Sequence, residues 1–352
     1  MHLALTRASG FARDLGIERP ILLAPMAGAC PVSLSAAVAA GGGLGACGAL
    51  LMSPEQIAGW ARDMRETSNG GFQMNIWIPD PAPKRDAAHE ERLRAHLAEW
   101  GPAVPTDAAE TPMLDFDAQC QAMLAASPAA MSSIMGVFPP DVVTEIKARG
   151  TRWFATVTTV AEARAAAAAG ADVIVAQGME AGGHRGAFDA DRAATALVGL
   201  FALLPAVVDA VDVPVVATGG IADARGIAAA LMLGASAVQI GTGFLRTPEA
   251  GTNPTWADAL ARTAPEDTIA TRAFSGRLGR SVRNAYTAAD GPEPAPYPIQ
   301  RSLTGPMRAQ AARDGNIDAM QAWAGQAAAR ASDEPAARIV TRLWEETLTL
   351  FG

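Results

Sequence analysis

Cysteine and long uncharged apolar runs are both scarce in this chain of 352 residues. The three cysteines, Cys30, Cys47 and Cys120, are odd in number and far apart, which argues against a disulfide framework and favours a reducing compartment. Charged residues interrupt the first twenty positions, so we expect no signal peptide there. No apolar run is long enough to predict a membrane span. We therefore expect a soluble, cytoplasmic protein without a membrane partner.

Basic clusters are missing as well, and lysine is so rare that arginine carries most of the positive charge. The 28 basic residues are outnumbered by 36 acidic ones, giving a formal net charge of −8, so nucleic acid is not expected as a partner. The chain also lacks a GKS or GKT loop, a G-x-S-x-G turn and a CxxC pair, which removes the usual markers of NTPases, hydrolases and thiol-redox proteins. We expect a protein that binds a small molecule, and a homo-oligomer is compatible with this composition.

Strand-like and helix-like segments alternate through most of the chain. A charged helix is expected near 84–99 after the third strand-like run, as part of the third strand-helix unit. Eight regular alternations favour an α/β protein with a closed (β/α)₈ barrel over an open sheet. The eight strand-like runs lie at 20–26, 44–50, 71–78, 129–136, 151–157, 172–176, 214–220 and 237–245.

Two regions do not fit this repeat. Residues 79–112 combine several prolines with many charges, and we expect this long insertion to cover the barrel mouth. Residues 253–330 are predicted to form a mainly helical lobe, or cap, over the site. Residues 331–352 should contain a last helix that returns to the barrel, which itself occupies 1–252.

Glycine turns follow the seventh and eighth strand-like runs, in ATGGIAD at 217–223 and QIGTGFL at 239–245. In a barrel, the N–H groups of these two loops and the adjoining helix N-terminus form a cradle for an anion. The sequence therefore predicts a phosphate site at Gly219, Gly220, Gly241 and Thr242. The alternative is two ordinary tight turns.

A histidine follows the sixth strand-like run, in QGMEAGGHRG at 177–186. The glycines at 182 and 183 allow the backbone to approach a ligand while His184 is held over it. Chemistry in α/β enzymes is done where parallel strands end, so the loop predicts a cofactor site. The alternative is a structural histidine that caps the loop.

Two other motifs are interpreted as structural. GLGACG at 43–48 matches G-x-G-x-x-G but runs from a helix into a strand, the reverse of the order that binds a pyrophosphate. His89 and His96 lie in a predicted charged helix without further ligands nearby, so we expect a solvated face and no metal site.

Taken together, the motifs resemble the nitronate monooxygenases, formerly called 2-nitropropane dioxygenases. The resemblance covers nearly the whole chain, and the histidine loop is its most specific part. It implies an enzyme that consists of a TIM barrel with an added lobe and that binds FMN. It also implies the reaction, which is the oxidation of alkyl nitronates, such as propionate 3-nitronate, by O₂ to carbonyl compounds and nitrite or nitrate. The motifs are APMAG (24–28), FQMN (72–75), QGMEAGGHRG, ATGGI, QIGTGFL, SGR (275–277), RN (283–284), YPIQ (297–300) and WAGQ (323–326).

The resemblance also implies roles for single residues. His184 resembles the catalytic histidine, which removes an α-proton from a neutral nitroalkane or stabilises a bound nitronate. Tyr297 and Arg301 are predicted at the substrate end, although a tyrosine in a proline-rich loop is more often a packing residue. The implied flavin contacts are the ring contacts Asn75 and Gln177, the wall Ala24, Pro25 and Met26, and the ribityl and phosphate contacts Gly182, Gly183, Gly219, Gly220, Gln239, Ile240, Gly241 and Thr242.

Other reactions remain open at this point, because one fold supports many chemistries. The first alternative is an FMN barrel enzyme that uses NAD(P)H to reduce a quinone or an enoyl thioester. A more distant one is a barrel that binds a phosphorylated ligand without catalysis. The EAGGHRG loop together with YPIQ and WAGQ favours nitronate oxidation.

Overall fold

A computed structural model describes residues 2–110 and 113–352. Its centre is a sheet of eight parallel strands in the order β1-β9-β8-β6-β5-β4-β3-β2. The strands are almost entirely buried and rich in Val, Ile, Ala and Met, as expected for a parallel sheet that is covered on its outer face. They are β1 (Ile21–Leu23), β2 (Gly45–Gly48), β3 (Phe72–Trp77), β4 (Ala130–Ile134), β5 (Arg152–Val157), β6 (Val173–Gln177), β8 (Val215–Thr218) and β9 (Ala237–Ile240).

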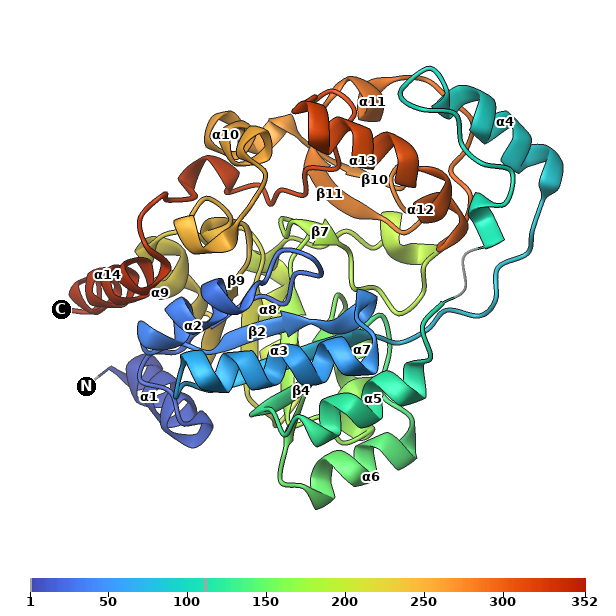
Figure 1. Ribbon diagram of the computed structural model, residues 1–352. Helices are drawn as coiled ribbons and strands as arrows, with labels where there is room; N and C mark the ends of the chain where they lie inside the picture. Colours follow the sequence, from blue (N-terminus) through green and yellow to red (C-terminus); the bar gives the residue numbers. More distant parts are fainter. Residues whose placement is uncertain (1, 111–112) are drawn as a thin grey trace.

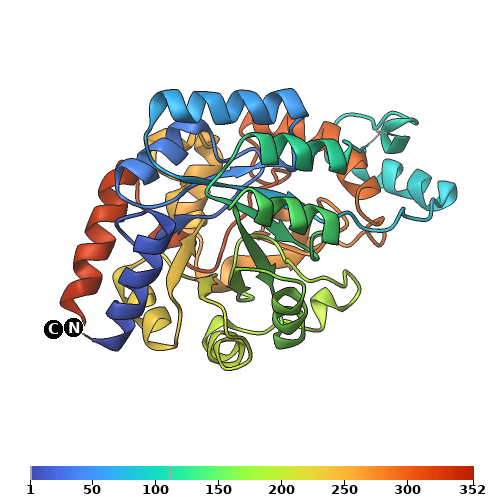
Figure 2. The same cartoon turned by 90° about the horizontal axis from the view of Figure 1, so that it is seen from below.

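The two edges of this sheet meet and close it into a barrel. Leu22 in β1 forms a parallel bridge with Leu44, which lies immediately before β2. Leu23 N donates to Leu44 O at 2.9 Å, and Leu44 N donates to Ile21 O at 3.1 Å. The predicted (β/α)₈ barrel is therefore confirmed, and Figure 2 shows it from below with helices around it.

Helices with one buried face surround the barrel. In α7, for example, a capping box between Thr159 and Glu162 starts the helix, and Ala163 and Ala166 provide its buried face. Among the described residues, no helix has both the length and the apolar character needed to cross a membrane. The surrounding helices are α2 (Val32–Ala40), α3 (Pro54–Thr67), α5 (Phe116–Ala125), α6 (Pro140–Ala148), α7 (Val160–Ala168), α8 (Leu200–Val208), α9 (Ala224–Met232) and α14 (Ala336–Thr349).

The amino-terminal end of the barrel is closed by α1 (Leu3–Leu15), a helix that the sequence analysis did not anticipate. Phe11 packs at 6.5 Å from the ring of Phe154 in β5, within a cluster that also includes Leu15 and Leu22. Figure 2 shows α1 beside α14, with the two chain ends close together. The opposite, carboxyl end of the strands is not covered by α1.

A lobe lies over that opposite, carboxyl end of the barrel (Figure 1). It contains helices, as expected, and also a three-stranded antiparallel sheet in the order β10-β11-β7, whose short strand β7 comes from the histidine loop. This sheet joins the lobe to the barrel. The elements are β7 (Gly183–His184), α10 (Pro254–Arg262), β10 (Thr268–Thr271), β11 (Gly279–Val282), α11 (Ala285–Ala288), α12 (Ile299–Leu303) and α13 (Gly305–Asp314).

The helix α4 (Ala87–Leu97) belongs to this lobe and not to the barrel. The prediction that a helix near 84–99 completes the third strand-helix unit is therefore wrong, and α5 takes that place beside α3. The physical reason is that Leu93 and Leu97 of α4 pack into the apolar cluster of the lobe with residues such as Leu303. Figure 1 shows α4 at the outer edge of the lobe.

Candidate functional site

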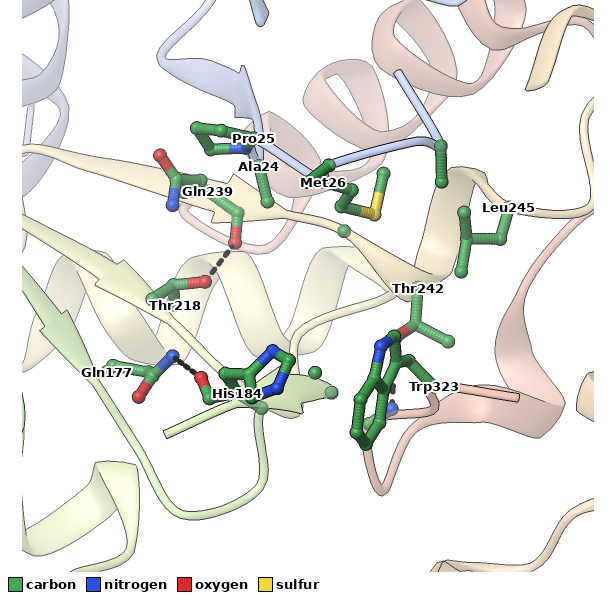
Figure 3. A pocket seen from close by; sticks show the side chains of 18 of the residues that line it. Ala24, Pro25, Met26, Gln177, His184, Thr218, Gln239, Thr242, Leu245 and Trp323 are labelled. Atoms are coloured by element: carbon green, nitrogen blue, oxygen red, sulfur yellow. Dashed lines mark hydrogen bonds between the residues drawn. The ribbon is translucent and has the colours of Figure 1, made fainter. Parts of the chain in front are cut away.

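A cavity of about 380 Å³ lies between the carboxyl ends of the barrel strands and the lobe. This size lies in the ordinary range for small-molecule and cofactor sites. Figure 3 shows Ala24 and Met26 on one side of the cavity and His184 and Trp323 on the other. Barrel loops and lobe residues both line it, so the site is built from the two parts of the molecule together.

The loops after β8 and β9 form one end of the cavity from backbone. Gly219 and Gly220 have φ angles of +115° and +68°, values that favour glycine. Within the described residues, the N–H groups of Gly219, Gly220 and Gly241 have no hydrogen-bond acceptor. Gly219 and Gly241 are half-buried and Gly220 is exposed, and all three line the cavity. Three backbone donors left free along one cavity wall suit an anion such as a phosphate.

A further glycine, Gly182, lets the lobe pack closely against the loops beside this cradle. A Cβ atom on Gly182 would lie 2.5 Å from Gly325 N and 2.8 Å from Thr242 Oγ1. The Thr242 hydroxyl oxygen already accepts a hydrogen bond from Gly325 N at 3.0 Å. The segment around Gly325 in the lobe thus locks onto the loop after β9, and only a glycine fits at position 182.

The nearby helix α9 contributes less to the cradle than the sequence suggested. Its first turn is capped by Asp223, whose Oδ1 accepts from Gly226 N at 3.0 Å. The same carboxylate pairs with Arg225 at 2.6 Å and with Arg330 at 3.4 Å. A carboxylate therefore already lies at this helix end, and the free anion donors are those of the glycine loops.

The histidine loop is fixed at both of its ends. Gly183 and His184 form the strand β7, in which His184 is paired with Gly279 of β11. Gln177 Nε2 donates to His184 O at 3.0 Å, and Gln177 Oε1 accepts from Gly186 N at 2.8 Å. Both atoms of the Gln177 amide thus bind the loop, a positioning role that the sequence analysis did not foresee for this residue.

Arg185, the residue after the histidine, holds the same loop from behind. Its guanidinium is buried and donates to the backbone oxygens of Gln177, Thr158 and Ala196 at 2.6, 3.3 and 3.2 Å. Burial lowers the pKa of Arg185 to about 10. Three carbonyl oxygens from the loops after β5 and β6 therefore converge on one cation and keep His184 in place.

The His184 imidazole is enclosed by aromatic rings and hydrogen-bonded on one side. The rings of Trp77 and Trp323 lie edge to face with it, at centroid distances of 4.6 and 4.8 Å. Its Nε2 lies 2.8 Å from Ser275 Oγ. Burial first, and then the positive charge of Arg277, Arg301 and Arg308, lower the pKa of His184 to about 3. The imidazole is therefore neutral near neutral pH.

The barrel wall supplies the remaining cavity residues predicted from the sequence. Asn75 lines the cavity and is oriented by Ser132, whose backbone O and Oγ accept from Asn75 Nδ2 at 3.1 and 2.9 Å. Gln239 also lines it, and its Oε1 accepts from Gln73 Nε2 at 3.0 Å. Ala24, Pro25 and Met26 form the wall after β1.

Two predicted site residues do not line the cavity. Ile240 is 2% exposed and packs in the apolar cluster that the strands share with outer helices, opposite in direction to Gln239. Tyr297 is buried behind the cavity wall, where its ring lies 5.2 Å from Trp77. Tyr297 therefore supports Trp77, which in turn contacts His184.

Two arginines give the lobe side of the cavity its charge. Arg308 donates to Thr304 Oγ1, Gln321 Oε1 and Arg301 O at 3.1, 3.0 and 2.8 Å. Burial, with Arg301 as the next cause, lowers the pKa of Arg308 to about 10. The Arg301 guanidinium has no hydrogen-bond or ion-pair partner in the described part of the chain. The described lining residues include no Asp or Glu, so this end of the cavity suits a negatively charged ligand.

Several residues that complete the site were not predicted from the sequence. Arg308, Trp256 and Gln321 gave no sequence signal, because they lie in separate lobe segments that only the fold brings together. Trp323 and Ser275 lie in WAGQ and SGR, motifs that carried the family resemblance, but no role was assigned to either side chain. No three His, Cys, Asp or Glu side chains gather as a metal site within residues 2–110 and 113–352.

Comparisons with known proteins agree with this geometry. The family model described as nitronate monooxygenase matches residues 11–346. A nitronate monooxygenase of Paraburkholderia phytofirmans is 41% identical over 342 residues, which cover 94% of this chain and 93% of that protein. The crystal structure of nitroalkane oxidase from Streptomyces ansochromogenes superposes with a TM-score of 0.88 at 36% identity, covering 98% of this chain and 100% of that one. FabK from Thermotoga maritima is more distant, with a TM-score of 0.72 at 28% identity and coverage of 97% and 96%.

Proposed function

The chain belongs to the nitronate monooxygenase family, and we propose that it uses FMN and O₂ to oxidise alkyl nitronates, such as propionate 3-nitronate, to carbonyl compounds with release of nitrite or nitrate. The similarity to an enzyme named nitronate monooxygenase extends over 94% of the chain. The structural similarity to a nitroalkane oxidase extends over 98% of it. Both relatives are named for nitro compounds, which supports this substrate class.

The observation that carries the proposal is the charge of the cavity. Arg301 and Arg308 line it, and the described lining residues include no carboxylate. A nitronate is an anion whose charge is shared by its carbon and its nitro oxygens, so it gains from this environment. Arg301 has no partner of its own among the described residues, and we infer that it pairs with a substrate anion, such as the carboxylate of propionate 3-nitronate.

The glycine loops fit the phosphate of FMN. The N–H groups of Gly219, Gly220 and Gly241 lack acceptors among the described residues, and all three glycines line the cavity. These are the features expected of a backbone cradle for a phosphate. When bound, FMN supplies the capacity to take electrons from the nitronate carbon and to pass them to O₂.

The barrel wall fits the rest of the cofactor. We infer that Asn75 and Gln239 face the flavin with their polar edges and that Ala24, Pro25 and Met26 form its backbone wall. Gln177 lines the same site while its amide holds the histidine loop. Gly183 and Thr242 complete the surroundings on the side of the lobe. Ile240 contributes through its place between Gln239 and Gly241, since its own side chain lies in the core.

We infer that His184 acts on the substrate as a neutral imidazole. Its low pKa, about 3, makes it a weak base, so a preformed nitronate should be turned over more readily than a neutral nitroalkane. The positive charge that stabilises the nitronate then comes from the arginines of the lobe. His184 orients the ligand against Trp77 and Trp323 and takes up the α-proton when a neutral nitroalkane is bound.

The buried cysteines favour a cytoplasmic location. Cys30, Cys47 and Cys120 are free and buried. Burial raises the pKa of Cys30 and of Cys120 to about 12, so both remain unreactive thiols. Detection of the protein in the cytosolic fraction of its source cells, separated from membranes and exported proteins, would test this location.

Oxygen consumption tests the proposed reaction directly. Purified flavin-loaded protein mixed with propionate 3-nitronate should consume O₂ and release nitrite or nitrate. The alternative, NAD(P)H-dependent reduction of a quinone or an enoyl thioester, predicts no oxygen uptake with the nitronate and oxidation of NAD(P)H when a quinone or enoyl thioester is added. A colourless protein that does not take up FMN would instead support a binding role without catalysis.

A further inference from the structure

A single hydroxyl group lies directly behind the imidazole of His184. Ser275 is 1% exposed and comes from the turn that precedes β11 in the lobe. Its Oγ lies 2.8 Å from His184 Nε2 and 3.1 Å from the backbone oxygen of Arg277. Ser275 does not line the cavity, so its hydroxyl contacts the histidine from the protein side.

The hydrogen-bonding capacity of these groups determines where the protons lie. A serine hydroxyl has one proton to donate and can accept two hydrogen bonds. The Arg277 oxygen can only accept, and Ser275 Oγ is its one donor within the described residues. If Ser275 donated to His184 instead, this buried carbonyl would be left unpaired, which is costly. Ser275 therefore donates to Arg277 and accepts from His184 Nε2–H.

The position of the Arg277 carbonyl is itself fixed. The Arg277 side chain is 2% exposed, and its guanidinium donates to both carboxylate oxygens of Asp80, with Nε to Oδ2 at 2.8 Å. It also donates to Ala187 O at 2.9 Å. Asp80 follows β3, the strand that ends at Trp77 beside the imidazole. The acceptor that orients the Ser275 hydroxyl therefore cannot easily rotate away.

We propose that Ser275 is a positioning residue that holds His184 in the tautomer with the proton on Nε2 and a free electron pair on Nδ1. Nδ1 has no partner among the described residues, so it is the imidazole nitrogen left for a ligand. His184 therefore meets a substrate as a hydrogen-bond acceptor and not as a donor. The catalytic role of this tautomer rests on the proposed function, whereas the assignment of the tautomer rests on the hydrogen bonds alone.

The tautomer has a defined chemical consequence for the two kinds of substrate. With a neutral nitroalkane, the α C–H bond breaks, the proton forms a bond to Nδ1, and the electron pair of the C–H bond remains on the nitronate. The imidazolium that results donates more strongly through Nε2–H to Ser275. With a preformed nitronate, Nδ1 offers no proton to the anion, so its charge is met by Arg301 and Arg308.

The tautomer can be read from nitrogen chemical shifts. The chain has four histidines, so long-range ¹H–¹⁵N spectra of flavin-loaded protein labelled with ¹⁵N-histidine contain few signals. His184→Asn identifies the signals of His184 by their loss. We expect a protonated Nε2 and an unprotonated Nδ1 at neutral pH. A protonated Nδ1 in the unmodified protein would overturn the proposal, whatever the substrate proves to be.

Ser275→Ala tests whether the serine sets this state. We expect the nitrogen chemical shifts of His184 to show a mixture of the two tautomers instead of the Nε2–H tautomer alone. Turnover of a neutral nitroalkane should fall roughly tenfold relative to turnover of a nitronate. Ser35→Ala is the matched control, because Ser35 is also fully buried and donates to a carbonyl oxygen, that of Ala46 at 2.7 Å, on the far side of the barrel core. It should leave the spectrum unchanged.

An unchanged tautomer in a folded, flavin-loaded Ser275→Ala protein would contradict the proposal. If that variant does not fold, the spectrum of the unmodified protein still decides, because a protonated Nδ1 there is incompatible with the proposed hydrogen-bond chain. A protein that shows the Nε2–H tautomer but consumes no oxygen with nitronates would leave the positioning role intact and reject the proposed reaction.

Discussion

The two halves of the cavity are built on different principles. The barrel half binds through backbone, with the N–H groups of Gly219, Gly220 and Gly241. The lobe half binds through side chains, with two arginines and two tryptophans around the substrate end. A backbone cradle accepts a constant group such as a phosphate, whereas side chains determine which substrate enters beside it.

Substitutions in the barrel half and in the lobe half should therefore have different effects. A change in the barrel half adds an atom where backbone segments lie close, so it should shift the loops of the cradle and weaken cofactor binding whatever the substrate. A change in the lobe half removes charge or packing, so its effect should depend on the substrate. His184 belongs to both halves, because its loop follows a barrel strand and pairs with β11 of the lobe.

The largest effect is expected at this shared residue. His184→Asn removes Nδ1 as a proton acceptor, so turnover of a neutral nitroalkane should fall about 10³-fold. Turnover of a preformed nitronate should fall about tenfold or less, because that substrate has already lost its proton. Steady-state kinetics with the two substrates measures this ratio. Equal losses on both would remove the assignment of His184 as a base.

The next effect tests the barrel half. In Gly182→Ala the new Cβ would lie 2.5 Å from Gly325 N and 2.7 Å from Ala324 C, both backbone atoms that cannot easily move. Flavin affinity should fall on the order of 100-fold, equivalent to an overpacking cost of about 3 kcal/mol. Titration of the apoprotein with FMN, followed by fluorescence, measures it.

Gly59→Ala is the control for this substitution. Its Cβ would meet only a flexible atom, Arg62 Nη2 at 3.6 Å, on the outer helix α3. The control should bind flavin like the unmodified protein. Unchanged flavin affinity in Gly182→Ala would show that cofactor binding does not depend on the close contact between the histidine loop and Gly325.

The lobe half should respond in a substrate-dependent way. Arg301→Met keeps much of the side-chain volume but removes the charge, so KM for propionate 3-nitronate should rise about tenfold. The flavin content should not change. KM for an alkyl nitronate without a carboxylate should rise much less. An equal rise in KM for both substrates would mean that Arg301 does not select for the second anionic group.

The smallest effect concerns the dependence of stability on pH. The pKa of His184 is lowered from 6.5 to about 3 in the folded protein, by burial and then by Arg277, Arg301 and Arg308. Below pH 6.5 the unfolded chain binds a proton at this histidine and the folded chain does not, so stability falls as the pH drops toward 3. Between pH 7 and pH 5, Tm of the unmodified protein should decrease by roughly 2 °C more than Tm of His184→Asn.

Thermal unfolding at both pH values measures this difference. His89→Asn serves as the control, because His89 lies on the outer face of α4 and contacts Glu293 O. That variant should follow the unmodified protein at both pH values. If His184→Asn did so as well, the imidazole would not be buried as a neutral group.

The barrel half could be predicted from the sequence because its signals are local. Each glycine turn follows a buried strand within a few residues, as in ATGGIAD after β8, and the histidine loop follows β6 in the same way. The position of a strand along the chain therefore also gives the position of its loop in a closed barrel. The eight strands were identified for the same reason.

The lobe half could not be predicted in this way. Arg301, Arg308, Trp256 and Trp323 come from separate segments that meet only after the lobe folds onto the barrel. The helix α4 was misassigned because its sequence carries many charges, whereas its few apolar residues, Leu93 and Leu97, decide where it packs. Nothing local indicates that Ser275 lies behind His184, since 91 positions separate them.

The central claim is that one cavity holds FMN at the glycine loops and a nitronate at the arginines of the lobe. The absorbance of the flavin in the absence of O₂ tests this claim most directly, because electrons pass only between a flavin and a substrate that are bound together. Propionate 3-nitronate mixed with the flavin-loaded protein in the absence of O₂ should reduce the flavin and bleach its absorbance, while NADH should leave it unchanged on the same timescale. Bleaching by NADH with no response to the nitronate would contradict the account.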